Sequence, residues 1–236
     1  MKILVVVAHP DDEVLGMGAT LKKLSDEKNR IKVVFLATGI FARRSDKYLN
    51  KADYKIDKNL KDKMMKQAKT LQNDARKALK ILGIKDIEFY KFPDNEMDKS
   101  SNLEITKTIE DIIQKFKPET IYTHTKNDIN VDHRAIFNAT ITATRPNPSL
   151  SVKKVICFEV PSSSEWNFGE IFSPNTFVDI KHELPYKIKA IKAYKNELRK
   201  FPHPRSVEAL EAIAKRWGSV AGLRSAEAFE LIREIS

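Results

Sequence analysis

Cysteine is nearly absent from this chain of 236 residues, in which Cys157 stands alone. A disulfide within the chain is therefore excluded, and so is a structural metal site built from several thiolates. Because secreted proteins commonly rely on disulfides, this composition favours a reducing compartment, and we expect the protein in the cytoplasm.

Long hydrophobic runs are missing as well. No apolar stretch approaches the ~20 residues that cross a bilayer, and the apolar segment after Lys2 is too short for the core of a signal peptide. We expect a soluble protein without a membrane span. The hydrophobic share of 42% supports one sizeable core, so we interpret residues 1–236 as a single domain.

Glycine is scarce too, with 7 residues in the chain. A dinucleotide-binding protein carries a GxGxxG or GxGxxA pattern after its first strand. The segment GMGATL has Leu21 where the third small residue belongs. This class of protein is therefore discarded.

Positive charge, in contrast, is in excess, with a formal net charge of +10. Residues 43–80 carry 13 Lys or Arg against 5 Asp and no Glu, a local excess of +8. One interpretation is a solvated lysine-rich helix, and another is a basic flap over a pocket for an anionic substrate. Only Tyr48 and Tyr54 supply aromatic rings there, so we expect no nucleic-acid partner. Four lysines recur at helical spacing and are expected on one helix face: Lys47, Lys51, Lys55 and Lys58.

Strand-like and helix-like segments alternate along the chain, which is typical of a doubly wound sheet. We expect an α/β fold of Rossmann-like type, with a mostly parallel sheet, helices on both faces and a helical C-terminal extension from about residue 179. The expected strands are residues 2–8, 30–38, 87–92, 120–124 and 152–160. The expected helices are residues 14–29, a long polar stretch ending near 75–84, 102–119 and 131–146.

Polar segments follow these strands where each strand ends. They are HPDDE, ATGIFARR, FPDNEMD and HTKNDINVDHR, at residues 9–13, 37–44, 92–98 and 124–134. Ligands of doubly wound sheets bind at the carboxyl ends of the strands. The four segments are therefore expected to converge on one crevice.

The first of these segments combines imidazole and carboxylate groups, which suit zinc or iron(II). Pro10 constrains the turn between His9 and Asp12, so both side chains can point to one metal ion. Asp11 then stands beside the metal, where a carboxylate can accept a proton from a water molecule. A catalytic site of this kind takes three protein ligands.

The third ligand is expected from the segment after the fourth strand. His133 is preceded by Asp132, and an adjacent acid can orient a ligand histidine or a nearby base. His124, at the end of its strand, competes for the same role and is otherwise a polar cap or a substrate contact.

AHPDDE near the N-terminus with a later DxNxDHR resembles the LmbE-like, or PIG-L, family of zinc-dependent de-N-acetylases. KILGI, FPDNEMD, ATRP, FEVPSSSEW and FPHPRS extend the similarity over most of the chain. The resemblance implies one zinc ion per chain, with iron(II) or another divalent metal as the alternative. It implies His9, Asp12 and His133 as metal ligands and Asp11 as the general base. Many members have a histidine three places before the last ligand, where this chain has Asn130.

The resemblance implies hydrolysis of an acetamide on an N-acetylglucosamine-type sugar, whose carrier is a nucleotide, a lipid or a glycoconjugate. In the reaction so implied we expect Asp11 to activate the water, Asn130 to donate a hydrogen bond to the oxyanion, and Asp132 to act beside them by orienting a histidine or the base. The leaving amine takes its proton from Asp11 or His124. The expected substrate contacts are Arg43, Asp94, His124, Arg134, Arg145 and Glu165.

Three alternatives remain beside this interpretation: a related amidase for a non-sugar or thiol-conjugate amide, a phospho-accepting protein, and a nucleic-acid-binding α/β protein. A phospho-accepting domain would leave His9 and His133 without a role. The sequence is compatible with a homo-oligomer and does not identify the sugar or its carrier.

Overall fold

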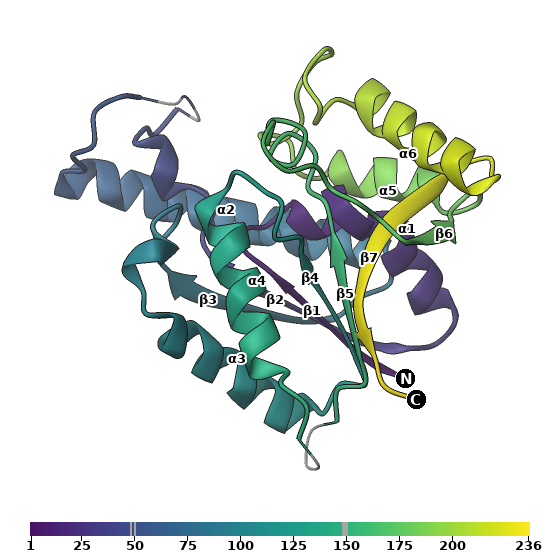
Figure 1. Ribbon diagram of the computed structural model, residues 1–236. Coiled ribbons are helices and arrows are strands. Elements are labelled where there is room, and N and C mark those ends of the chain that lie inside the picture. Colours follow the sequence, from purple (N-terminus) through teal and green to yellow (C-terminus); the bar gives the residue numbers. More distant parts are fainter. Residues whose placement is uncertain (48, 50, 148–150) are drawn as a thin grey trace.

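The computed structural model describes residues 1–47, 49, 51–147 and 151–236, which form one seven-stranded sheet flanked by helices (Figure 1). The strand order is β3-β2-β1-β4-β5-β7-β6. Strands β1 to β5 pair in parallel, whereas β7 runs antiparallel to both β5 and β6. The strands are β1 Lys2–Val7, β2 Arg30–Ala37, β3 Asp86–Phe92, β4 Thr120–His124, β5 Lys154–Phe158, β6 Thr176–Asp179 and β7 Ala226–Glu234.

Helices cover both faces of this sheet (Figure 1). Alternate residues of β1 point to opposite sides, so Ile3 and Val5 join the core beneath α1, α2 and α5, while Leu4 and Val6 join the core beneath α3 and α4. The helices are α1 Asp12–Asp26, α2 Lys58–Ile81, α3 Asn102–Phe116, α4 Val131–Ala143, α5 Leu184–Ile191 and α6 Val207–Ala221. Two short 3₁₀ turns, η1 Phe41–Arg43 and η2 Met97–Lys99, follow β2 and β3.

The expected α/β architecture is confirmed, with the five predicted parallel strands in place. Helices α5 and α6 supply the helical C-terminal part, and the structure adds β6 and β7, which the sequence analysis missed. In β7 the segment AEAFELIRE is rich in Ala and Glu, which favour helices. Pairing with β5 and β6 overrides this local preference.

The lysine-rich stretch differs from the expectation. Helix α2 begins at Lys58, and Lys47, Lys51 and Lys55 lie in irregular chain before it. The prediction of one shared helix face for these lysines is therefore wrong. Asp57 caps α2, since its side chain accepts a hydrogen bond from the backbone N–H of Leu60 at 2.7 Å, and this cap sets where the helix starts. Tyr48, also named in the sequence analysis, lies outside the described residues.

The carboxyl ends of β1 to β5 lie at one edge of the sheet, as parallel pairing requires. Among the helices formed by the described residues, none combines the length and hydrophobicity needed to cross a membrane.

Candidate active site

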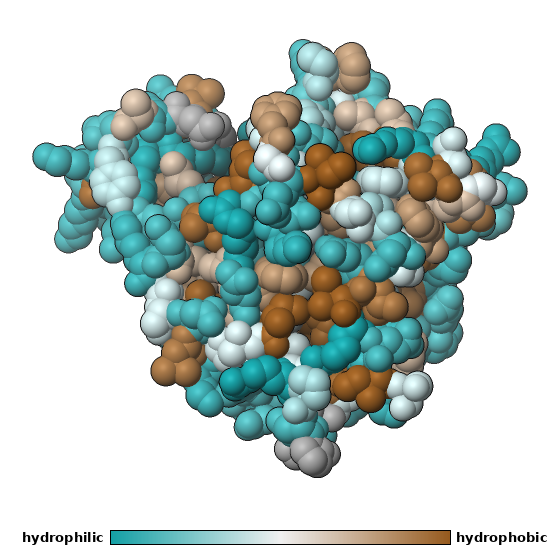
Figure 2. Space-filling model, in the orientation of Figure 1, coloured by the Kyte–Doolittle hydropathy of each residue, from teal (hydrophilic) through white to brown (hydrophobic). Residues whose placement is uncertain are grey.

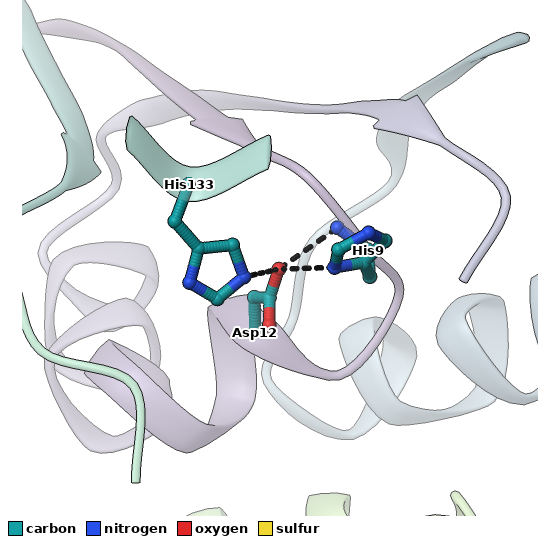
Figure 3. Close-up of side chains that lie close together, drawn as sticks. All are labelled: His9, Asp12 and His133. Atoms are coloured by element: carbon teal, nitrogen blue, oxygen red, sulfur yellow. Dashed lines mark hydrogen bonds and ion pairs between the residues drawn. The ribbon is translucent and has the colours of Figure 1, made fainter. Parts of the chain in front are cut away.

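Three side chains from separate places in the chain meet at the end of β1 (Figure 3). His9 follows β1, Asp12 begins α1, and His133 lies in the first turn of α4. Asp12 Oδ2 is 3.5 Å from His9 Nδ1 and 3.3 Å from His133 Nε2. All three residues are buried, and their ligand atoms lie within 4.8 Å of one another.

Two polar atoms of this group lack hydrogen-bond partners within the described part of the chain. These atoms are Asp12 Oδ1 and His133 Nε2, and both are buried. Buried polar atoms are nearly always satisfied, so two such atoms in one cluster indicate a ligand between them. A carboxylate oxygen and two imidazole nitrogens are donors that Zn²⁺ and Fe²⁺ accept. The residues therefore fit a metal ion.

Carboxylates behind the two histidines orient their rings. The ring nitrogen Nδ1 of His133 is 2.8 Å from Asp128 Oδ2. His9 Nε2 is 2.9 Å from Asp132 Oδ2 and 3.0 Å from Asp94 Oδ1. When the outer nitrogens donate to these acids, His133 Nε2 and His9 Nδ1 keep their lone pairs for a metal.

His9 also belongs to a second group of possible metal ligands, together with Asp94 and Asp132. Asp132 also accepts backbone hydrogen bonds from Asn95 at 2.6 Å and Met97 at 3.0 Å. Asp132 therefore connects the loop after β3 to the group formed by His9, Asp12 and His133. Asp94 accepts from the backbone N–H of Ala42 at 2.9 Å, which ties η1 to the same place.

The local electrostatics favour a positive charge in the cluster. Burial lowers the pKa of His133, but the carboxylates of Asp12 and Asp128 outweigh it and raise that pKa to about 9. Burial raises the pKa of Asp12, but His133 and His9 outweigh it and hold that pKa well below its usual range. The same charge distribution stabilises a cation.

Asp11 occupies a constrained position beside the cluster. Its φ of 122° lies in a region that non-glycine residues rarely adopt. Its Oδ2 accepts a hydrogen bond from Arg205 Nη1 at 2.8 Å, and its backbone N–H donates to Glu13 Oε2 at 3.1 Å. Burial raises the pKa of Asp11 well above its usual value, and the Arg205 guanidinium opposes this effect.

Glu13 helps to hold the backbone of Asp11 in place. It is fully buried and accepts a hydrogen bond from the Tyr194 hydroxyl at 2.5 Å. Burial raises the pKa of Glu13 to about 7, against the lowering effect of that hydrogen bond.

Asn130 stands at the start of α4. Its Oδ1 accepts a hydrogen bond from the backbone N–H of Asp132 at 2.9 Å, which makes Asn130 the cap of the helix. This bond assigns the side-chain oxygen as the acceptor, so the NH₂ group remains to donate. Asn130 lines the cleft described next.

A cleft of about 590 Å³ gives access to the cluster. In Figure 2 the upper surface is indented between the segment that precedes α2 and the loops that precede α6. Its lining includes Ala42 and Arg43 from the segment after β2, and Ser162, Trp166 and Arg205 from the loops after β5 and before α6. His9, Asp11, Asp94 and Asn130 lie along the cleft as well.

Of the predicted substrate contacts, Arg43 and Asp94 lie on the cleft, and the other four lie outside its described lining. Arg43 Nη2 donates to Glu197 Oε2 at 2.6 Å. His124 is buried; its Nε2 accepts from the backbone N–H of Ala8 at 2.9 Å, and its ring stacks on His133 at 3.9 Å. Burial and the charge of His133 lower the pKa of His124 to about 3.

The remaining three, Arg134, Arg145 and Glu165, are not among the residues that line the cleft. Arg134 donates to the backbone oxygen of Asp128 at 2.7 Å, and Glu165 Oε2 accepts from the backbone N–H of Ser162 at 2.5 Å. Arg145 lies beyond the far end of α4 and is 3.9 Å from Glu110 on α3. The helix begins at the site, so its length separates Arg145 from the cleft.

Sequence reasoning missed four residues of the site: Asp128, Tyr194, Glu197 and Arg205. Asp128 belongs to the segment HTKNDINVDHR, and its spacing of five residues before His133 was an available signal. Arg205 belongs to FPHPRS, which had been noted only as part of a resemblance.

The chain is similar to known deacetylases. The model of the PIG-L family, described as GlcNAc-PI de-N-acetylase, matches residues 4–144. An uncharacterized deacetylase, YaiS of Escherichia coli K12, is 29% identical over 200 residues, 82% of this chain and 90% of that protein. The diacetylchitobiose deacetylase of Thermococcus kodakarensis is 25% identical over 238 residues, 98% of this chain and 83% of that protein.

The fold also occurs with another activity. The crystal structure of GalB, the 4-carboxy-2-hydroxymuconate hydratase of Pseudomonas putida KT2440, has a TM-score of 0.73 with 21% identity and covers 100% of this chain and 97% of that chain. Fold alone therefore does not identify the reaction. The family match spans more than half of the chain and includes His9, Asp12 and His133, so this chain belongs to the PIG-L family of de-N-acetylases.

Proposed function

We propose that this protein is a zinc-dependent hydrolase that removes the acetyl group from an N-acetylated amino sugar. The observation that carries the proposal is the buried group of His9, Asp12 and His133, with Asp11 beside it at the end of an open cleft. One metal ion per chain would be held by His9 Nδ1, Asp12 and His133 Nε2. When bound, zinc polarises the acetyl carbonyl and acidifies a water molecule.

Asp11 is the proton acceptor in this mechanism. It accepts a proton from the attacking water, whose oxygen forms the new bond to the acetyl carbon. Arg205 favours the ionised form of the Asp11 carboxylate, against the effect of burial, and fixes its direction through the 2.8 Å hydrogen bond. The side-chain NH₂ of Asn130 donates to the oxygen of the tetrahedral intermediate.

Collapse of that intermediate breaks the carbon–nitrogen bond. Asp11 then returns its proton to the leaving amine, and the products are acetate and a free amino sugar. His124 does not serve as this acid in our proposal. Its ring is buried behind His133, and its Nε2 is already occupied by the backbone N–H of Ala8.

The substrate class follows from the relatives and the cleft together. The Thermococcus relative is a diacetylchitobiose deacetylase, and a Bacillus cereus relative is named a probable N-acetyl-alpha-D-glucosaminyl L-malate deacetylase. In this chain the cleft offers the indole ring of Trp166, which can pack against a sugar, and the guanidinium group of Arg43, which can donate to hydroxyl or phosphate oxygens.

A substrate panel tests the proposal. The zinc-loaded protein is incubated with N-acetylglucosamine, its glycosides, nucleotide-linked N-acetylhexosamines and N-acetylated amides without a sugar, and the primary amine formed is measured. We expect amine release from at least one sugar substrate and none from the sugar-free amides. Release only from sugar-free amides would favour the alternative amidase activity.

A further inference from the structure

A second groove adjoins the catalytic cleft. It has a volume of about 730 Å³ and lies between α2 and the segment that follows β3. Asp94 lines both spaces, while neighbouring residues of one segment face opposite sides: Gly39 and Ala42 line the cleft, and Thr38 and Phe41 line the groove. The cleft and the groove thus adjoin at Asp94, and a ligand that extended from the cleft along this residue would reach the groove.

The floor of the groove is apolar. It is formed by Phe41, Ile56, Met65, Ala68, Phe92 and Pro93. Met65 is 51% exposed, although it projects from the middle of a helix whose other apolar residues are mostly buried. An exposed apolar surface in a concave place is typical of a ligand site.

The rim of the groove is basic. Lys61 and Lys69 come from α2, one helical turn before and after Met65, and Lys91 comes from the opposite wall. Within the described residues none of these three lysines has an ion-pair partner. Other charged groups nearby are already paired, since Arg44 donates to Glu96 at 2.7 Å and Lys63 donates to Asp46 at 3.1 Å.

We propose that this groove binds an apolar group that carries a negative charge, and that this group is the carrier attached to the amino sugar. The apolar part lies on the floor, and the anionic part lies within reach of Lys61, Lys69 and Lys91. The link to the sugar rests on the proposed deacetylase function, whereas the binding of an apolar anion does not. This assigns to the +8 stretch a role that its sequence alone leaves open.

A binding measurement tests the groove by itself. Octyl phosphate, 1-octanol and inorganic phosphate are titrated calorimetrically into the zinc-loaded wild-type protein. We expect octyl phosphate to bind at one molecule per chain and more tightly than either part alone. The variant Lys61→Gln/Lys69→Gln/Lys91→Gln should weaken this binding about tenfold, because each exposed charge contributes modestly. Met65→Glu, at an exposed helical position, should weaken it further by repulsion.

A matched variant controls for net charge. Lys85, Lys181 and Lys215 are exposed lysines outside both lining sets, and changing all three to Gln removes the same charge. This variant should bind octyl phosphate as the wild type does. An equal loss of octyl phosphate affinity in both triple variants, or the absence of saturable binding, would contradict the proposal that this groove binds an apolar anion.

Steady-state kinetics then test the carrier assignment separately from the deacetylase reaction. The octyl phosphate diester of N-acetylglucosamine, linked through the anomeric oxygen, is compared with the methyl glycoside, with amine release as the readout. We expect a KM about tenfold lower for the diester, lost in the Lys61/Lys69/Lys91 variant without change in kcat. Equal KM values would overturn the carrier assignment while the deacetylase function stands. Binding of octyl phosphate without amine release from any substrate would contradict the function and leave the groove as a binding site.

Discussion

Arg205, in the loop before α6, donates a hydrogen bond to Asp11, at the end of β1, over a distance of 2.8 Å. The contact joins residues 194 positions apart in the chain. Arg205 Nε also donates to Ser162 Oγ at 3.0 Å, which fixes the guanidinium in the lining of the cleft. The C-terminal third of the chain thus positions the base that the N-terminal motif supplies.

Replacing Arg205 with Gln should lower kcat by about 10- to 100-fold, because the Asp11 carboxylate loses its charged partner in a buried place. The metal content should remain at the wild-type level, since Arg205 touches none of the three ligands. Arg205→Lys should recover part of the rate. Wild-type kcat in Arg205→Gln would show that Arg205 does not position the Asp11 carboxylate for catalysis.

The two neighbouring acids should respond differently to the same change. Asp11→Asn should retain the metal and lower turnover by about 10²- to 10⁴-fold, because it removes a proton acceptor and no ligand. Asp12→Asn should lower metal affinity, which elemental analysis after dialysis measures. If Asp11→Asn emptied the site and Asp12→Asn left it filled, the two roles would be reversed.

Asp128→Asn tests the orientation of His133. The amide cannot provide the charge that Asp128 places 2.8 Å from His133 Nδ1, so metal affinity should fall by about 10- to 100-fold. Arg134→Gln is the matched control, because the Arg134 side chain donates to the backbone oxygen of Asp128 and not to its carboxylate. A competition assay with a zinc chelator measures both. Equal affinity in Asp128→Asn and wild type would contradict this role.

The grouping of His9, Asp12 and His133 could be predicted from sequence because these residues lie in two short motifs, HPDDE and DxNxDHR, at the ends of strands. The residues that orient them could be predicted only in part. Asp132 was expected to assist a ligand, but its contact with His9 depends on how β1 and β4 pair. Arg205 and Tyr194 reach the site from the helical C-terminal part, and nothing local in the sequence specifies that packing.

Some substrate contacts could not be placed from sequence for a related reason. Arg134 and Arg145 both belong to the segment after the fourth strand, but Arg134 lies four residues after the cap of α4 and Arg145 lies beyond its last turn. Membership in a segment near a strand end does not tell which side chains face the cleft, because helix rotation decides that.

Glu159 should make stability depend on pH. It accepts a hydrogen bond from Trp217 Nε1 at 2.6 Å, and burial raises its pKa to about 7 from an ordinary value of 4.5. A raised pKa means that the folded protein holds a proton that the unfolded chain releases. The contribution of Glu159 is therefore complete below pH 4.5 and is lost as the pH rises through about 7.

Glu159→Gln should remove this part of the pH dependence, because the amide keeps an acceptor for Trp217 and cannot ionise. Urea unfolding at pH 5 and pH 8 measures the difference, which is at most about 3 kcal/mol for a shift of this size. Glu13 titrates in the same range and is present in both proteins, so only the difference between them is interpreted. Parallel pH profiles would show that Glu159 does not titrate as stated.

The most direct test of the central claim is a metal titration of the metal-free protein with amine release from an N-acetylated amino sugar as the readout. We expect negligible release without metal, an increase that saturates at one zinc ion per chain, and no increase in His133→Ala at the same zinc concentrations. Full turnover in the metal-free protein, or stoichiometric zinc and wild-type turnover in His133→Ala, would contradict it.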